Sequence, residues 1–284
     1  MHINSWRELK NEMATSSPAV RYFEFETEKG SKAHLVVVDM NSKKVRLRPF
    51  VNSSGSDTSD SADSLNAIAA VNGGYFNLSN GMSTSYVVVN GKTVCDPKLN
   101  PALVGNAKLA PFMDAIIDRT EVRLGSAKDG KQIIDIANHN SANLHAGATD
   151  DSLQAGPRLL PALTAEKEAF VRKEADGKDV DSIGVHKTAA RTAFGVTDDG
   201  HVLIICIAGG KQDEFSSGVT LSQLADLMRQ LGCVNAMNFD GGTSTTMVVA
   251  LKGADGGAVG RKMVCGKIPQ TKVKSTMLVV PVVQ

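Results

Sequence analysis

A carboxylate and an amide stand side by side at the end of an apolar segment, VNAMNFD, which covers residues 234 to 240. Side chains on a β-strand alternate between its two faces. Met237 and Phe239 therefore share one face, which we expect to meet the core. Asn238 and Asp240 share the other face, where an amide and a carboxylate together suit acid–base chemistry on a polar substrate.

The residues after Asp240 form a glycine turn that is rich in hydroxyl groups. Gly241 and Gly242 allow a ligand to come close to the backbone, and Thr243 and Ser244 add hydroxyl donors. Free backbone amides at this turn, next to a cation, would suit phosphate or sulfate. Asp-Gly-Gly is also a common hairpin turn between two strands, so a purely structural interpretation stays open.

The segment ARTAFGV, residues 190 to 196, offers the cation. Strand alternation puts Arg191 on one face together with Ala193 and Gly195, and we expect this row of small residues to leave space for a ligand above the sheet. A guanidinium matches phosphate or carboxylate in bidentate geometry. An arginine in a structural ion pair is the alternative interpretation.

Two further glycine turns offer polar groups. The segment NGGYF, residues 72 to 76, follows the apolar stretch AIAAV, and its adjacent glycines indicate a turn with free amides. Asn72 at this strand end is placed to bind a sugar hydroxyl, and we expect it to meet Arg191, Asn238 and Asp240 at one place. The segment AGPR, residues 155 to 158, is another turn with a basic residue beyond it.

Motifs for metals, cofactors and common hydrolases are sparse. His139 and His145 lie near Asp150 and Asp151, but the spacings H-x-x-x-H and H-E-x-x-H do not occur, so we predict no metal and no cofactor. The sequence has no G-x-S-x-G elbow, Walker loop or dinucleotide fingerprint. This excludes most familiar hydrolase, kinase and dehydrogenase classes.

The elements that carry these residues are mostly strands. A capping box at Thr220 and Gln223 begins a helix that Gly232 ends, and Asn90-Gly91 between apolar runs predicts a tight hairpin turn. The other predicted elements are a helix from Ser5 to before Pro18, strands within 22–51, a surface loop from 52 with a short helix near 63–69, strands near 102–109, 112–118, 131–137, 194–208, 234–239, 244–251 and 276–283, and a surface insertion at 164–188.

Strands outnumber helices in this pattern, and hairpin turns join many of them. The predicted fold class is therefore α+β, with mixed, largely antiparallel β-sheets and a few packed helices. We expect one domain over residues 1–284, in which residues 1–65 supply an N-terminal helix and strands and residues 66–284 carry the motifs.

The composition of the chain limits the classes of partner that the protein can bind. The 284-residue chain is 42% hydrophobic and 21% charged, so it can bury a core. Lys plus Arg (31) nearly balance Asp plus Glu (30), which excludes the one-signed field that nucleic acid or anionic lipid requires. The run VLIICIA is far shorter than the ~20 residues that span a bilayer, and the N-terminus lacks an apolar signal core, so we expect no membrane span and see no signal in the chain as given. Four widely spaced cysteines without C-x-x-C argue against structural zinc.

Taken together, four segments resemble the phosphodiester glycosidase family: NGGYF (72–76), AGPRLL (155–160), ARTAFGVTDDGHVLIICIAGG (190–210) and SSGVTLSQLADLMRQLGCVNAMNFDGGTSTTMVV (216–249). The last two are highly specific in order and composition. The family's Asn-Gly-Gly falls on Asn72 to Gly74, its Arg-Thr on Arg191 and Thr192, and its Asn-x-Asp-Gly-Gly on Asn238 to Gly242.

The resemblance implies a glycoside hydrolase that cleaves a sugar-1-phosphodiester and releases an N-acetylglucosamine-like sugar from a phosphate-linked glycan, outside the cytoplasm (secreted, periplasmic or cell-surface). Asp240 would act as base or nucleophile at the anomeric carbon, and Glu214 or Asp213 would be the second carboxylate that glycosidases usually need. Stabilisation of the departing phosphate by Arg191 can replace much of a general acid's work. The implied catalytic residues are Asp240, Arg191 and Glu214, and the implied substrate-binding residues are Asn72, Gly73, Gly74, Tyr75, Arg158, Lys211, Asp213, Asn238, Gly241, Gly242, Thr243 and Ser244.

Two other functions stay open. Many relatives have an acidic residue before Gly and Arg where this chain has Ala208-Gly209-Gly210-Lys211, which favours a carbohydrate-binding or cell-wall module that does not turn over substrate. A metal-assisted phosphodiesterase would use Asp240 with the histidines near residues 139 to 145.

Overall fold

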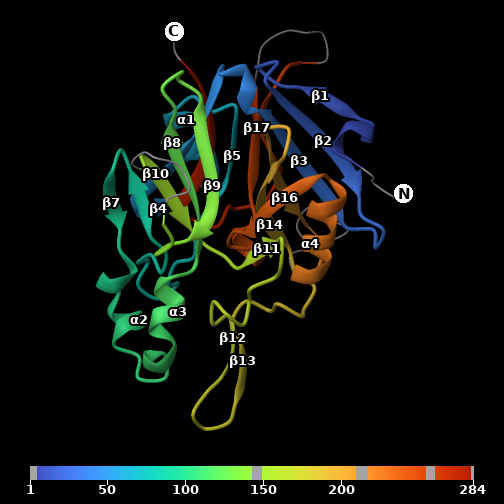
Figure 1. Cartoon of the computed structure of the whole chain (residues 1–284). Helices are drawn as coiled ribbons and strands as arrows, with labels where there is room; N and C mark the ends of the chain where they lie inside the picture. Colours follow the sequence, from blue (N-terminus) through green and yellow to red (C-terminus); the bar gives the residue numbers. More distant parts are fainter. Residues whose placement is uncertain (1–4, 143–148, 209–216, 254–259, 283–284) are drawn as a thin grey trace.

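The computed structural model of the chain describes residues 5–142, 149–208, 217–253 and 260–282. In this part of the chain, strands form three larger antiparallel sheets and one separate two-stranded hairpin (Figure 1). The largest sheet has seven strands, in the order β1 (Glu12–Ala14), β2 (Val20–Glu26), β3 (Lys32–Asp39), β15 (His201–Ile207), β14 (Arg191–Thr197), β16 (Cys233–Asn238) and β11 (Arg158–Leu160). Strands from the beginning of the chain thus pair with strands from its last third.

The helix α4 (Leu221–Gln230) covers one face of the seven-stranded sheet, on the right of Figure 1. The Thr220 hydroxyl accepts a hydrogen bond from the Gln223 backbone, and the Gln223 side chain accepts from the Thr220 backbone, so the predicted capping box is confirmed. A Cβ at Gly195 would lie 2.7 Å from Met228 Cε. The row of small residues on β14 therefore makes room for this helix, and the prediction that it leaves space for a ligand is wrong.

The other face of the seven-stranded sheet packs on a five-stranded sheet through the main hydrophobic core, which includes Phe194, Phe239 and Met277. This second sheet has the order β18 (Gly260–Cys265), β17 (Met247–Leu251), β5 (Ala69–Asn72), β19 (Val273–Pro281) and β4 (Val45–Ser56). The helix α1 (Thr58–Ser64) packs on its outer side through Ala62.

A third sheet contains β7 (Lys92–Cys95), β6 (Val87–Val89), β10 (Asp151–Gln154), β8 (Thr120–Ser126) and β9 (Gln132–Asn138). Asn90 and Gly91 join β6 to β7 with φ angles of 52° and 71°, as the predicted turn requires. The short helices α2 (Pro101–Val104) and α3 (Met113–Ile117) lie below this sheet in Figure 1.

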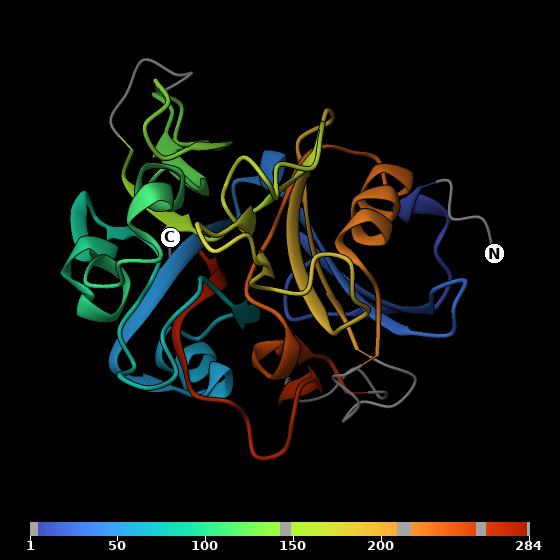
Figure 2. The ribbon, with the colours of Figure 1, turned by 90° about the horizontal axis from the view of Figure 1, so that it is seen from below.

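A hairpin of β12 (Val171–Lys173) and β13 (Asp179–Asp181) extends away from the sheets at the bottom of Figure 1, and Figure 2 views the molecule from that side. The tip of this insertion is exposed, as predicted. Its base is different, because Glu168 and Phe170 are both 1% exposed. The insertion therefore contributes buried side chains beneath the sheets.

The fold class is α+β with antiparallel sheets and packed helices, so this prediction is confirmed. Four local predictions are wrong. The helix expected from Ser5 is a single 3₁₀ turn, Trp6–Glu8, whose Ser5 side chain makes no cap bond, and the strand β1 follows it. The helix expected near 63–69 lies at Thr58–Ser64, because β4 continues through the predicted surface loop to Ser56.

The other two errors are strands expected near 102–109 and 112–118, which are helical. Pro101 occupies the first helical position of α2, and the Asn100 side chain accepts from the Ala102 backbone. Pro111 likewise lies in the 3₁₀ turn Ala110–Phe112 that leads into α3. Proline at the start of a helix does not lower the stability of the helix. In so short a run, the spacing of apolar residues does not distinguish a helix from a strand.

Candidate active site

The two main sheets meet at a corner formed by Asn72 and Asp240. Asn72 ends β5, and its Nδ2 donates to the Asp240 carbonyl at 2.6 Å, while the Asp240 amide donates to Gly73 O at 3.0 Å. Asn72 Oδ1 accepts from the Thr192 hydroxyl at 2.7 Å and from the Thr246 amide at 3.1 Å. Asn72 is fully buried, so its side chain joins the sheets here and holds the Asp240 turn, whereas the sequence assigned it to a sugar hydroxyl.

The Asp240 carboxylate lies at the beginning of a tight turn that continues into the 3₁₀ helix Gly242–Ser244. Asp240 Oδ1 accepts from the Gly241 amide at 2.9 Å, and the Ser244 hydroxyl also bonds to the carboxylate. Burial nevertheless dominates and raises the pKa of Asp240 to about 6, against these two stabilising bonds. The residue as a whole is half-buried, so an ionisable group with a raised pKa lies near the surface at this turn.

The backbone amides of the turn are occupied. The Gly241 amide bonds to Asp240 Oδ1, and the Gly242 amide bonds to Ala190 O at 2.8 Å. The prediction that these amides are free to hold phosphate is therefore wrong for Gly241 and Gly242. Gly242 has a φ of 58°, which explains the second glycine of the motif by backbone conformation.

Asn238 and Tyr75 form a second polar group next to Asp240. Asn238 Nδ2 donates to the Tyr75 hydroxyl at 2.8 Å, and both side chains donate to Gly156 O. Burial, followed by the charge of Asp240, raises the pKa of Tyr75, so the phenol stays neutral. Asn238 is 1% exposed, and its Oδ1 accepts no hydrogen bond from the residues that the structure describes. A buried acceptor of this kind suits a donor group of a ligand.

Arg191 lies beside the turn, since a Cβ at Gly241 would come within 3.7 Å of Arg191 Cδ. The structure therefore brings Arg191 together with Asp240, as expected. Arg191 is 2% exposed, and its guanidinium is directed towards backbone carbonyls of other segments. Four backbone carbonyls accept from it: Val219 at 3.2 Å, Ile183 at 3.0 Å, Lys187 at 2.9 Å, and Gly184.

Arg158, another described residue that the resemblance assigns to substrate binding, lies on the wrong side of its strand. Arg158 is opposite Met237 in the pairing of β11 with β16, so the two side chains share a face that Asn238 does not. Arg158 Nη2 donates to Ile136 O on β9. Lys211, Asp213 and Glu214 lie outside the described residues, as do the glycines at 209 and 210.

Three residues near the site were not predicted from the sequence: Arg119, Glu168 and Phe170. Arg119 Cζ lies 3.7 Å from the centroid of the Phe170 ring, and the Tyr75 ring packs on the same phenylalanine at 5.4 Å between centroids. Arg119 Nε donates to Glu168 O at 3.1 Å. These residues come from segments without helical or strand periodicity, so no pattern in the sequence singles them out.

The Glu168 carboxylate is surrounded by donors. Oε1 accepts from the Thr120 hydroxyl at 2.7 Å, from the Arg158 amide at 2.9 Å and from the Thr164 hydroxyl, and Oε2 accepts from the Thr120 amide at 3.0 Å. A Cβ at Gly156 would collide with Oε2 at 2.2 Å. Glu168 therefore holds the segment whose Gly156 carbonyl binds Tyr75 and Asn238.

Within the part of the chain that the structure describes, His139 of the metal hypothesis bonds to Glu121 and not to Asp240. His139 Nδ1 lies 2.9 Å from Glu121 Oε2, and its ring stacks on Tyr86 with centroids 4.0 Å apart. His145 lies outside the described residues. Within the described ranges, no group of three or more His, Cys, Asp or Glu side chains is arranged to hold a metal ion.

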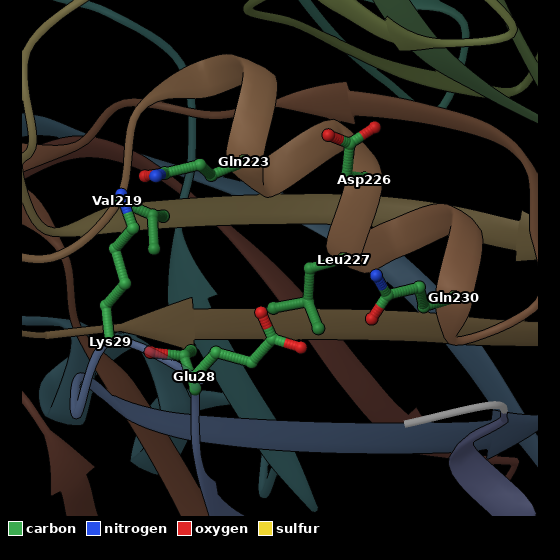
Figure 3. A pocket seen from close by; sticks show the side chains of 8 residues that line it. Glu28, Lys29, Val219, Gln223, Asp226, Leu227 and Gln230 are labelled. Carbon is green, nitrogen blue, oxygen red and sulfur yellow. The ribbon is translucent and has the colours of Figure 1, made fainter. Parts of the chain in front are cut away.

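A pocket of about 190 Å³ lies elsewhere, between α4 and the turn that joins β2 to β3 (Figure 3). Two of its polar groups have partners within the fold: Gln223 caps its own helix, and Asp226 accepts from Arg229 at 2.7 Å. None of the predicted site residues lines it. The helices of the described chain include none that is long and apolar enough to cross a membrane.

Several solved structures share the fold, among them the following three proteins. A hypothetical protein from Synechocystis is 14% identical with a TM-score of 0.63, over 96% of this chain and 64% of that one, so the chain spans about two thirds of that protein's length. The catalytic domain of zebrafish N-acetylglucosamine-1-phosphodiester alpha-N-acetylglucosaminidase, auto-inhibited by its pro-peptide, is 16% identical with a TM-score of 0.60, over 94% and 85%. A Burkholderia pseudomallei protein described as exported is 16% identical with a TM-score of 0.64, over 95% and 76%.

The chain is therefore an antiparallel α+β protein. At the corner between its two main sheets, the carboxyl group of Asp240, which has a raised pKa, lies next to the buried amide side chains of Asn72 and Asn238. The sequence model of the phosphodiester glycosidases matches residues 65–280, and the chain belongs to this family. No curated protein matches the sequence.

Proposed function

We propose that the protein hydrolyses a sugar-1-phosphodiester and that Asp240 is the carboxylate that acts at the anomeric carbon. The observation that carries this proposal is the Asp240 carboxyl itself, half-buried at a strand end with its pKa raised to about 6. A group whose pKa lies near the working pH is the most effective general base or nucleophile that a side chain can supply. The buried Asn238 acceptor beside it supports recognition of a substrate hydroxyl or amide.

In the proposed reaction, the bond between the anomeric carbon and the phosphate oxygen breaks, and the phosphate leaves with the electron pair. Water supplies the hydroxyl of the released sugar, and Asp240 either takes the proton from that water or attacks first and is displaced by it. A phosphate monoester is a stable leaving group, which lessens the need for a general acid. We propose Asp213 or Glu214 as the second carboxylate.

Our proposals for the substrate class and the location rest on the family and on its solved neighbours. We propose an N-acetylglucosamine-like sugar, in line with the name of the zebrafish enzyme, on a phosphate-linked glycan. The Burkholderia neighbour described as exported supports work outside the cytoplasm. We propose that Asn238 and Tyr75, whose side chains lie next to Asp240, contact the substrate, whereas Asn72 holds the Asp240 turn and Arg191 ties the 183–187 segment to β14.

The test is steady-state kinetics on a sugar-1-phosphodiester, with calorimetric binding of the same compound. Asp240→Asn keeps the size of the side chain and removes its charge, so turnover should fall by at least ~10²-fold while affinity changes little. Asn238→Ala should weaken affinity as well as turnover, because a bond to the sugar acts in ground and transition states alike.

The alternatives are outcomes of the same measurements. Wild-type protein that binds the diester without cleaving it would identify a binding module. Loss of turnover with a chelator would favour the metal-assisted phosphodiesterase. Full activity in Asp240→Asn would move the catalytic role to Asp213 or Glu214.

A further inference from the structure

Arg191 and Arg119 are two buried arginines near the site, and their guanidinium groups are used differently. Four backbone carbonyls accept from Arg191, so its fork has little capacity left for an anion. Arg119 gives one hydrogen bond, from Nε to Glu168 O. Among residues 5–142, 149–208, 217–253 and 260–282, none accepts a hydrogen bond from its two terminal nitrogens.

The open fork of Arg119 is an unusual use of a buried cation. The residue is 8% exposed, and its guanidinium rests on the Phe170 ring. A guanidinium carries five N–H donors, and those that the fold does not use remain available to a ligand. Burial also lowers the pKa of Arg119 to about 10, which leaves the group charged at neutral pH. Arg119 thus remains a positive charge whose two terminal nitrogens have no acceptor among the described residues.

The position of this charge relates it to the proposed reaction. Phe170 carries Arg119 on its face and Tyr75 at 5.4 Å, and the Tyr75 hydroxyl receives Asn238 Nδ2 at 2.8 Å. The Asp240 carboxylate is stabilised by Gly241 and Ser244 and by no cation of the described chain. A phosphodiester would bring a second negative charge towards Asp240, and that pair of like charges requires a cation nearby.

We propose that Arg119, through its terminal N–H groups, binds the phosphate of the substrate, in the role that the sequence assigned to Arg191. This inference rests on the proposed function for the identity of the substrate, and its ligand class is a phosphate mono- or diester. Two parallel N–H donors match two phosphate oxygens, which lysine does not reproduce. Arg191 is then a positioning residue, which ties the segment at 183–187 to the start of β14.

The experiment measures the affinity of inorganic phosphate by calorimetry and by inhibition of diester cleavage. Arg119→Gln should weaken phosphate binding by at least about tenfold, as expected for loss of a charged, bidentate contact. Arg119→Lys keeps the charge but not the fork, so it should fall between wild type and Arg119→Gln. It also serves as the working variant if Arg119→Gln does not fold.

Arg172→Gln is the matched control. Arg172 also lies over a phenylalanine, with Cζ 5.7 Å from the Phe112 centroid, but its guanidinium bonds to Ala169 O and pairs with Glu174. Phosphate affinity should stay within about twofold of wild type in this variant, because both terminal nitrogens of Arg172 already have protein partners.

The outcomes separate this inference from the proposed function. Folded Arg119→Gln or Arg119→Lys protein with wild-type phosphate affinity would overturn the inference while leaving hydrolysis intact, and so would wild-type protein that binds no phosphate. Wild-type protein that binds phosphate through Arg119 but never cleaves a sugar-1-phosphodiester would support the inference and remove the proposed function.

Discussion

Asp240 and Glu168 are two carboxylates at opposite sides of the same polar region, and the protein surrounds them differently. Asp240 lies at a strand end with one backbone amide and one hydroxyl as donors, and burial raises its pKa to about 6. Glu168 lies in a connecting segment, where two backbone amides and two hydroxyls bond to its oxygens. The first carboxylate is left under-stabilised, and the second is satisfied.

This difference separates a chemical role from a structural one. A charge that the fold does not compensate raises the free energy of the folded state and keeps the group reactive. A buried charge with four donors holds other groups in place, and here those groups include the segment on which Tyr75 and Asn238 depend. The two carboxylates should therefore respond to neutralisation with opposite changes in stability.

Removal of Glu168 should give the largest change. In Glu168→Ala, the amides of Thr120 and Arg158 lose a buried acceptor, and Arg119 loses a neighbouring negative charge. The free energy of unfolding should fall by about 3 kcal/mol, measured by urea denaturation at pH 7.5. Glu166→Ala, an exposed residue two positions earlier, is the control and should stay within about 0.5 kcal/mol of wild type. An equal loss of unfolding free energy in Glu168→Ala and Glu166→Ala would contradict a structural role for the Glu168 carboxylate.

Neutralisation of Asp240 should act in the other direction. The folded-state pKa of about 6 lies above the ordinary value of 3.8, so the folded protein binds the proton more tightly than the unfolded chain. The resulting cost is absent below pH 4, grows as pH rises to 6, and is complete above it. Asp240→Asn should match wild type at pH 4 and be roughly 2 kcal/mol more stable at pH 7.5. A variant less stable than wild type at pH 7.5 would contradict this sign.

The smallest effect is expected at Thr192, in the corner that holds the Asp240 turn. Its fully buried hydroxyl donates to Asn72 Oδ1, which also accepts from the Thr246 amide. Thr192→Val keeps the shape and removes one of the two donors, so the free energy of unfolding should fall by about 1 kcal/mol. The measurement is the same urea titration, with turnover per folded molecule as a second readout. A loss as large as that of Glu168→Ala would show that the sheet corner, and not the connecting segment, is the main source of stability in this polar region.

The half of the site that lies on regular strands was predictable. Strand alternation placed Asn238 and Asp240 on one side of β16, and the structure brings them together with Asn72 and Arg191 at one corner. The strands within 22–51, the Asn90-Gly91 hairpin and α4 are also confirmed. Each of these depends on local periodicity or a local turn.

The other half depends on contacts between distant segments. Nothing near Arg119 or Glu168 marks them, because their partners lie up to 49 positions away and in segments without period. Alternation gave the face of Arg191 but not the direction of its guanidinium, which the carbonyls of the 183–187 segment decide. The helices at 101–104 and 113–117 had a local signal, proline at the first turn, that apolar spacing concealed.

The sheet that contains β4 and β5 has a consequence for synthesis of the chain. Both strands pair with β19, and β5 also pairs with β17, so strands made early acquire these partners only after about 200 further residues have been translated. Until then, β4 and β5 present open hydrogen-bonding edges to the cell. The nascent protein should therefore depend on chaperones, and truncation before β19 should yield an aggregating chain that lacks the corner at Asn72 and Asp240.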